Sequence, residues 1–200
     1  MIRRTVDVVV ATCVLALASP LLAAAVVAIR LESRGRAIYR QRRVGLGGRE
    51  FDVLKLRTMV AGAEQMGAGL AVDADDPRIT RIGAFLRRSS VDELPNLWNV
   101  VRGEMSLIGP RPTVPSQVAQ YDERQRGRLA IKPGLTGLAQ VNGRASLPWS
   151  ERIEMDLYYI AHRSPLLDAR ILARTVRVLF GGGGLYRGES GGWDGPGGRR

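Results

Sequence analysis

The sequence is poor in the residues that build disulfides and metal centres. Its 200 residues include one cysteine, Cys13, and one histidine, His162. A lone cysteine excludes an intramolecular disulfide, and a zinc site would need several Cys or His ligands. We therefore expect neither feature. We interpret Cys13 as a small packing residue and assign no functional role to His162.

Lysine is also scarce, although the chain is strongly basic. Of its 30 basic residues only Lys55 and Lys132 are lysines, and the formal net charge is +11. The planar guanidinium of arginine suits bidentate contact with phosphates. The charge therefore indicates an anionic partner, which could be nucleic acid, lipid headgroups or a phosphorylated substrate. Charge alone does not decide among them.

Charge is almost absent from residues 5–29, which form one apolar block. As a helix this block would reach ~37 Å, enough to cross a hydrocarbon core of ~30 Å. It is longer than the apolar part of a cleaved signal peptide, which is the competing interpretation. Ser19 and Pro20 interrupt the block, and proline kinks or breaks a helix.

Arginines flank the apolar block on both sides. Arg3 and Arg4 precede it, and six arginines follow it between residues 30 and 43. Because basic flanks stay on the cytoplasmic side, this pattern places both ends of the block there. We therefore predict a re-entrant membrane helix, broken at Ser19 and Pro20, that enters and leaves by the same leaflet. A kinked spanning helix is the alternative.

The rest of the sequence predicts an α/β domain that is mostly helical. Residues 37–59 read as a small β-hairpin around a glycine-rich turn. Helical patterns follow at residues 82–88, 92–102, 116–130, 150–162 and 165–180. The last of these helices carries three arginines on one face. This pattern is typical of an amphipathic helix in a membrane interface, and also of a packed helix with a solvated face.

Two adjacent carboxylates, Asp92 and Glu93, form the sharpest local feature. Ser90 followed three residues later by Glu93 is a capping box, which would place both acids in the first turn of a helix. Arginines lie just upstream, including Arg87. Two carboxylates among arginines suit Mg²⁺ and a diphosphate, and a carboxylate can attack phosphorus. Acids that merely stabilise a helix start are the simpler interpretation.

Two further segments carry cations in settings that could bind phosphate. Pro110 and Pro112 fix the backbone on both sides of Arg111, which would preset its guanidinium; a structural turn is the alternative. Lys55 and Arg57 place two cations at the end of a predicted strand. A strand edge protected by charge explains that pair equally well.

Together these segments resemble the signature blocks of one family. KLRTM, RRSSVDELPNLWNVVRGEMSLIGPRP and KPGLTGLAQVNGR are similar to blocks of the bacterial sugar transferases, the monotopic phosphoglycosyl transferases. The resemblance covers residues 1–180, without the additional membrane helices of larger members, so the chain is similar to the minimal form. It implies a membrane hairpin and flank (residues 1–36) and a cytoplasmic catalytic domain (37–180). Residues 181–200 lie outside the resemblance, and their glycine-rich composition predicts a disordered tail.

The resemblance also implies an activity and roles for residues. The enzyme would transfer a sugar-1-phosphate from a UDP-sugar to undecaprenyl or another polyprenyl phosphate, with release of UMP. Asp92 matches the nucleophile and Glu93 its partner, and both are candidate Mg²⁺ ligands. Residues that match substrate-binding positions are Lys55, Arg57, Arg87, Pro110, Arg111 and Pro112. The implied location is the bacterial inner membrane, with the catalytic domain facing the cytoplasm and a homodimer as one option.

Two other functions stay open from the sequence. A basic peripheral membrane scaffold would explain the charge, but the intact Asp92-Glu93 pair speaks against it. A nucleic-acid-binding protein would explain the charge too. The apolar block and the lack of a nucleic-acid motif speak against that, so no nucleic acid is expected as a partner. The sequence does not name the sugar or the polymer.

Overall fold

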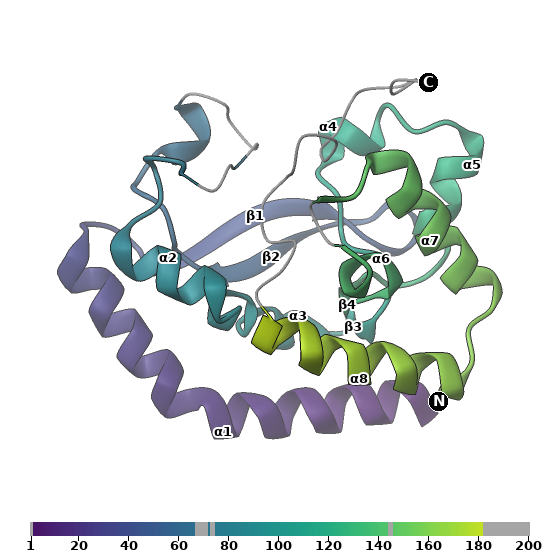
Figure 1. Cartoon of the computed structure of the whole chain (residues 1–200), viewed down its shortest axis with the longest axis horizontal. Helices are drawn as coiled ribbons and strands as arrows, with labels where there is room; N and C mark the ends of the chain where they lie inside the picture. Colours follow the sequence, from purple (N-terminus) through teal and green to yellow (C-terminus); the bar gives the residue numbers. More distant parts are fainter. Residues whose placement is uncertain (1, 67–71, 73–74, 144–145, 182–200) are drawn as a thin grey trace.

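The chain forms a long N-terminal helix that lies along one side of a small α/β domain (Figure 1). The structure, a computed structural model, describes residues 2–66, 72, 75–143 and 146–181. Helices predominate in these ranges, and the two sheets have two strands each. The predicted tail lies outside the described residues, apart from Gly181 at the end of the last helix.

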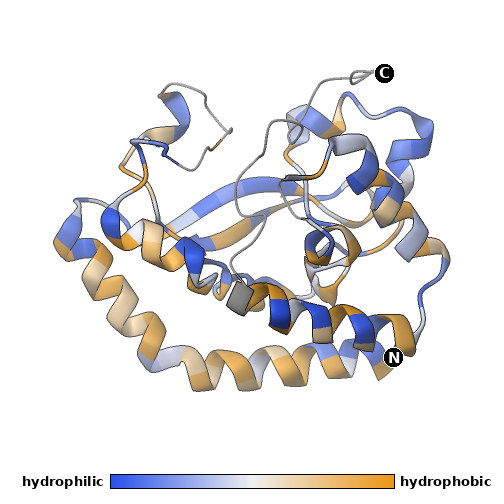
Figure 2. Cartoon of the chain, viewed as in Figure 1, coloured by the Kyte–Doolittle hydropathy of each residue, from blue (hydrophilic) through white to orange (hydrophobic). Residues whose placement is uncertain are grey.

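The apolar block forms helix α1 (Ile2–Glu32). Within the described residues it is the one helix long and apolar enough to cross a membrane, judged by length and composition. A core helix of a soluble protein would pass the same test but would be mostly buried. Only 11% of the most apolar part of α1 is buried. Figure 2 shows apolar residues along most of its length.

The predicted break at Ser19 and Pro20 is wrong, because α1 stays helical through both residues. Figure 1 shows instead a bend near the middle of the helix. Pro20 has no N–H to donate to the carbonyl of Ala16, four residues earlier. The hydroxyl of Ser19 donates to that carbonyl over 2.8 Å. This bond satisfies the carbonyl, so the helix bends without breaking.

Both ends of α1 are fastened to the same domain. Near its start, the buried Asp7 accepts a hydrogen bond of 2.8 Å from Ser106 Oγ, and Arg3 pairs with a carboxylate of the last helix. At its end, Arg57 donates to the carbonyl of Ser33 over 2.8 Å. Both ends of α1 are therefore held against the same domain, while most of the apolar residues between them are exposed.

The predicted hairpin is confirmed. Strands β1 (Ile38–Val44) and β2 (Glu50–Leu56) pair antiparallel, with Tyr39 opposite Lys55. A short 3₁₀ turn, η1 (Leu46–Gly48), connects them. Gly47 has φ 64 there, a left-handed conformation that glycine adopts without a steric penalty. The hairpin brings Lys55 to the edge of the candidate site.

Helix α2 (Arg81–Arg88) is found where it was predicted, but the next helix starts later than expected. Val91–Glu93 form a 3₁₀ turn, η3, and α3 begins only at Asn96 (Asn96–Arg102). The predicted capping box is wrong: Ser90 is left-handed, with φ 55, and its side chain caps nothing. The carboxylate of Glu93 instead binds two cations, as described below.

A second sheet holds the loop that carries Arg111. Strands β3 (Ser106–Ile108) and β4 (Gly134–Thr136) pair in parallel. The segment between them was predicted as one helix over residues 116–130. It is divided into short pieces, α4 (Pro115–Val118), α5 (Glu123–Arg126) and the 3₁₀ turn η4 (Gly127–Ala130).

The remaining elements close the domain around the site. They are η2 (Ala63–Gln65), α6 (Leu138–Val141), α7 (Trp149–Ala161) and α8 (Pro165–Gly181). The helices predicted at residues 150–162 and 165–180 are confirmed as α7 and α8. Buried side chains of α1, β2 and α3, among them Ala11, Phe51 and Leu97, form the core beneath the hairpin.

Candidate functional site

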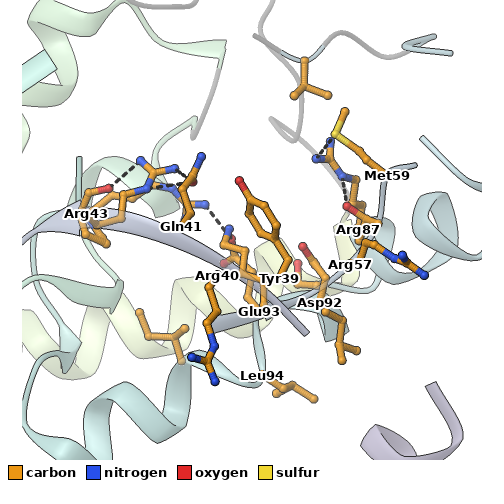
Figure 3. A pocket seen from close by; sticks show the side chains of 18 of the residues that line it. Tyr39, Arg40, Gln41, Arg43, Arg57, Met59, Arg87, Asp92, Glu93 and Leu94 are labelled. Atoms are coloured by element: carbon orange, nitrogen blue, oxygen red, sulfur yellow. Dashed lines mark hydrogen bonds and ion pairs between the residues drawn. The ribbon is translucent and has the colours of Figure 1, made fainter. Parts of the chain in front are cut away.

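A cavity of about 1600 Å³ lies between the hairpin, α2, the loop after β3 and helices α6 to α8. Its wall contains every charged residue predicted for the site, and Pro112; Pro110 is not part of it. The predicted residues that line it are Lys55, Arg57, Arg87, Asp92, Glu93, Arg111 and Pro112. Figure 3 shows several of these side chains with others that line the cavity. The structure therefore gathers segments that are far apart in the sequence.

Glu93 is held between two cations. Lys55 Nζ donates to Glu93 Oε1 over 2.7 Å, and Arg111 Nη2 donates to the same oxygen over 2.6 Å. Burial alone would raise the pKa of Glu93. The charges of Arg111 and Lys55, together with these hydrogen bonds, outweigh burial and hold the pKa well below its ordinary value. Glu93 is therefore a fixed negative charge.

Asp92, the adjacent residue, has the opposite environment. It is only 8% exposed, and its carboxylate has no hydrogen bond or ion pair to any described part of the chain. Burial, and then the charge of Glu93, raise its pKa to about 6, against the charges of Lys55, Arg87 and Arg111. The carboxylate therefore lines the cavity, unpaired and of raised basicity, which are the properties of a nucleophile.

The backbone before Asp92 is strained. Ser90 is the one non-glycine residue among those described that has a positive φ. Such a conformation is sterically costly for a residue with a Cβ atom, and it tends to occur at functional sites. This turn ends α2 and begins η3, so it sets the direction in which Asp92 leaves the backbone.

Hydrogen bonds to three of its backbone carbonyls hold the loop that carries Arg111. The carbonyl of Pro110 accepts from Gly134 N over 2.9 Å, and that of Arg111 accepts from Arg128 Nη2 over 3.2 Å. Arg43 Nη1 donates to the carbonyl of Pro112 over 3.1 Å. The two prolines were expected to fix this segment. The structure shows that three hydrogen bonds also hold this segment, and so fix the backbone position from which the side chain of Arg111 extends.

Arg87 and Lys55 complete the cations around the carboxylates. Arg87 Nε donates to Thr58 Oγ1 over 2.9 Å, which holds the end of α2 against the segment after β2. Burial lowers the pKa of Lys55, although Glu93 opposes that shift. Both side chains line the cavity, so both remain within reach of an anionic ligand.

Arg57 has a different environment from its neighbours. It is 9% exposed, and its guanidinium donates to the carbonyls of Ser33 and Arg34 at the end of α1. These contacts make it a fastener between the hairpin and α1. Its assignment to substrate binding stays a prediction, which these contacts do not require.

Sequence reasoning missed one face of β1. Tyr39, Gln41 and Arg43 alternate along the strand and line the cavity. Gln41 Nε2 donates to Glu64 over 2.7 Å. Arg43 Nε donates to Gln41 over 3.0 Å (Figure 3). Burial, and then the charge of Arg111, lower the pKa of Arg43 to about 10. The two-residue period of the strand was the signal that could have found this face.

A second buried ion pair lies elsewhere on the cavity wall. Arg128 Nη2 is 2.7 Å from Asp156 Oδ2, and their side chains are 4% and 2% exposed. Arg128 also lies over the ring of Trp149, 5.0 Å from its centroid. The two buried charges satisfy each other, and Arg128 also supports the Arg111 loop, so we assign this pair a structural role.

Mg²⁺, which the sequence predicted, needs few protein ligands. Within the described residues no cluster of three or more His, Cys, Asp or Glu side chains is placed to hold a metal. Mg²⁺ commonly binds one or two carboxylates together with substrate phosphates and water. The unpaired carboxylate of Asp92 fits that pattern. Glu93 fits less well, because one of its oxygens already contacts two cations.

An unpaired carboxylate in an arginine-lined cavity is chemically suited to phosphorylated ligands. The sequence match agrees with this class: the chain belongs to the bacterial sugar transferase family, which it matches over residues 1–182.

The chain is similar to several curated relatives. It is 46% identical over 186 residues to the UDP-glucose:undecaprenyl-phosphate glucose-1-phosphate transferase of Caulobacter vibrioides, covering 89% of this chain and 69% of that one. It is 38% identical over 199 residues to an uncharacterized sugar transferase of Haemophilus influenzae, covering 92% of this chain and 42% of that one. A UDP-N-acetylgalactosamine-undecaprenyl-phosphate N-acetylgalactosaminephosphotransferase of Aeromonas hydrophila is 42% identical over 189 residues, covering 92% and 44%. The chain therefore spans less than half of the last two relatives.

Proposed function

We propose that the chain transfers a sugar-1-phosphate from a UDP-sugar to undecaprenyl or another polyprenyl phosphate, and so begins the assembly of an exopolysaccharide or glycoconjugate. The observation that carries this proposal is the carboxylate of Asp92, which is buried, unpaired within the described chain and surrounded by cations. The names of the Caulobacter and Aeromonas relatives support the choice of substrates.

In the first step a carboxylate oxygen of Asp92 attacks the phosphorus that bears the sugar. A new bond forms between this oxygen and phosphorus, and the bond to the bridging oxygen of the diphosphate breaks. UMP leaves with that oxygen and its electron pair. The sugar phosphate stays on Asp92 as an acyl phosphate.

In the second step a phosphate oxygen of the polyprenyl phosphate attacks the same phosphorus. The bond to Asp92 breaks, the carboxylate is restored, and the product is a polyprenyl diphosphate-sugar. Neither step needs a net proton, so positioning and charge stabilisation are the main requirements. One site serves both phosphates in turn because they attack or leave at the same phosphorus.

The surrounding residues have distinct roles in this scheme. Arg87, Arg111 and Lys55 bind and neutralise phosphate oxygens, and Glu93 keeps Lys55 and Arg111 in place. Mg²⁺, held by Asp92 and the substrate's phosphates, would neutralise charge on the diphosphate. The hydrogen bonds to the carbonyls of Arg111 and Pro112 keep the loop from moving as charge shifts.

We also propose that α1 anchors the enzyme in the cytoplasmic membrane as a re-entrant helix. Both of its ends are fastened to one domain, through Asp7 and Arg57, while its apolar middle is exposed. A straight spanning helix would put these two ends on opposite sides. Accessibility of tags placed before Arg3 and after Arg36 tests this topology: tags on opposite sides of the membrane would contradict it.

Release of UMP tests the reaction. The full chain, in detergent or nanodiscs with Mg²⁺ and undecaprenyl phosphate, is given a panel of UDP-sugars. We expect one or a few donors to release UMP, and Asp92→Asn to lower the rate by about 10³-fold or more, since it removes the attacking oxygen's charge. Intact mass of wild-type protein with donor but no lipid should gain one sugar phosphate, and Asp92→Asn should not.

Two outcomes would contradict the proposal. Wild-type turnover retained in Asp92→Asn would exclude this residue as the nucleophile. No release with any donor, from protein whose unfolding transition shows that it is folded, would favour a basic membrane scaffold. Equal binding of wild type and Asp92→Asn to anionic vesicles would then support the scaffold function.

A further inference from the structure

Gln140 lies on the wall of the cavity, and its buried side-chain amide has no hydrogen-bond partner in the described chain. It lies in α6, directly after β4, and is 8% exposed. Neither Oε1 nor Nε2 has a hydrogen-bond partner in the described chain, and both atoms are buried. Gln140 lines the same cavity as Asp92, and apolar residues that include Leu135, Ala139 and Leu172 line this cavity as well.

Such an arrangement is unfavourable for the protein alone. A buried amide that loses water without gaining a partner destabilises the fold. Asn99 shows the usual solution in this molecule. It is fully buried, its Nδ2 donates to the carbonyl of Asp52 over 2.8 Å, and its Oδ1 accepts from Leu54 N over 3.1 Å. Asn99 does not line the cavity, whereas Gln140 does.

Among the buried amide side chains of the described residues, Gln140 is the one with both polar atoms buried and unpaired. A polar group that is left unpaired by the fold and placed on a ligand cavity is a candidate for contact with the ligand. A carboxamide presents one donor and one acceptor side by side. Its complement is a group that also presents both.

The two proposed substrates differ in this respect. A polyprenyl chain has no hydrogen-bonding group, and an ionised phosphate only accepts. The imide edge of uracil, a pair of sugar hydroxyls and an acetamido group each offer a donor and an acceptor. We propose that Gln140 is a specificity-determining residue that binds either the uridine or the transferred sugar of the donor. This inference rests on the proposed function and deepens it.

The wall that carries Gln140 is fixed relative to the phosphate-binding loop. Gly109 N donates to the carbonyl of Thr136 over 2.9 Å, just before α6 begins. Gly137 packs so closely that an added Cβ would lie 2.2 Å from the carbonyl oxygen of Gly109 and 2.7 Å from Oε1 of Gln140. The backbone at the start of α6 is therefore packed directly against the segment that leads to Arg111.

The size of the cavity agrees with a ligand that reaches beyond its phosphates. Its volume, about 1600 Å³, exceeds the ~300–1,000 Å³ of common ligand sites. A diphosphate bound by Arg111 and Lys55 would occupy a small part of it. The remaining space, bounded partly by α6 and α8, is available to the nucleoside and the sugar.

Gln140→Leu is the sharpest test, because leucine keeps much of the volume but forms no hydrogen bonds. We expect this variant to unfold at a higher temperature than wild type, since it removes an unpaired polar group. We also expect the KM for the UDP-sugar to rise by about tenfold or more, because a site built to hydrogen-bond its ligand loses that contact. Initial rates of UMP release at saturating undecaprenyl phosphate measure the KM.

Inhibition by UMP identifies which part of the donor is bound. UMP contains the uridine of the donor, which is uracil and ribose, but not the transferred sugar. If its inhibition constant rises together with the KM, the ligand of Gln140 lies in the uridine. If only the KM rises, the ligand is the transferred sugar. Asn99→Leu is the control for stability: the same loss of an amide should lower its unfolding temperature, because its partners become unpaired.

A KM and an inhibition constant that both stay within about twofold of wild type would overturn the inference, since ordered water would then be the partner of Gln140. The proposed function is judged separately, from wild-type turnover. Turnover by wild type with an unchanged KM in Gln140→Leu removes this inference alone. Wild-type protein that neither turns over nor shows a thermal shift with UMP removes both.

Discussion

Two parts of the same cavity wall use the same pair of residue types in opposite ways. At the Arg128–Asp156 pair one carboxylate meets one guanidinium, and both are less than 5% exposed. Around η3, three cations surround two carboxylates; Glu93 binds two of them, and Asp92 has no bonded partner in the described chain. Burial raises the pKa of both Asp156 and Asp92. They differ in that the carboxylate of Asp156 is bound by a guanidinium, whereas that of Asp92 has no bonded partner among the described residues and is available to react.

Breaking the matched pair should have the largest effect on stability. Asp156→Asn leaves the charge of Arg128 buried and uncompensated, which typically destabilises by about 3–5 kcal/mol. Urea unfolding of the detergent-solubilised protein measures the change. Glu154→Gln is the matched control, because it removes an acid from an exposed Arg124–Glu154 pair and should stay close to wild type. Equal losses in the two variants would contradict the comparison.

Neutralising Glu93, the acid that binds both Lys55 and Arg111, should mainly affect turnover. Glu93→Gln leaves Lys55 and Arg111 without the charge that holds them, so we expect kcat to fall by about 100-fold. The charge of Glu93 also raises the pKa of Asp92. The acid limb of the rate profile should therefore move to lower pH in this variant. A limb that moves upward would show that Glu93 does not act on Asp92 in this way.

The pH profile of wild type should report Asp92 directly. Its pKa is raised to about 6, and only the ionised carboxylate attacks. Below that pH the rate should fall by about tenfold per unit. The raised pKa of Asp92 also makes stability depend on pH, in the direction opposite to the rate. The folded state holds the proton to higher pH than the unfolded chain, so this group's contribution to stability falls as pH rises from about 4 to 6. Asp92→Asn should remove that dependence.

The smallest effect is expected at the strained turn. Ser90→Gly removes the Cβ atom from a residue at φ 55, so we expect stabilisation of about 1 kcal/mol or less, reduced by glycine's greater freedom in the unfolded chain. Ser90→Val should destabilise, because a β-branched side chain fits this conformation poorly. Thermal unfolding of both variants checks the sign. Little change in either would mean that the turn relaxes easily.

The elements that repeat a pattern were predictable from the sequence. The glycine-rich turn between two strand-like runs in residues 37–59 predicted the hairpin, and helical patterns predicted α2, α7 and α8. The start of α3 was not predictable from the capping-box pattern. Glu93 has strong partners in Lys55 and Arg111, which lie far away in the sequence, and their attraction overrides a local cap. Only the three-dimensional structure shows that competition.

The site was predicted unevenly for a similar reason. Asp92, Glu93, Lys55 and Arg111 come together as expected. The position of Arg57 was not predictable, because its main partners are backbone carbonyls just after α1, which any sequence would supply. Gln140 stands out only through the absence of a partner. A sequence does not record such an absence.

The fastening of α1 also has a consequence for biosynthesis. Asp7 binds Ser106, 99 residues later, and Arg3 binds Asp168, 165 residues later. Translation proceeds from the N-terminus, so α1 leaves the ribosome before Ser106 and Asp168, which anchor its start, have been made. During that interval its apolar surface has no protein to lie against. The nascent chain must therefore deliver α1 to lipid or to a chaperone before the domain that holds it has been made.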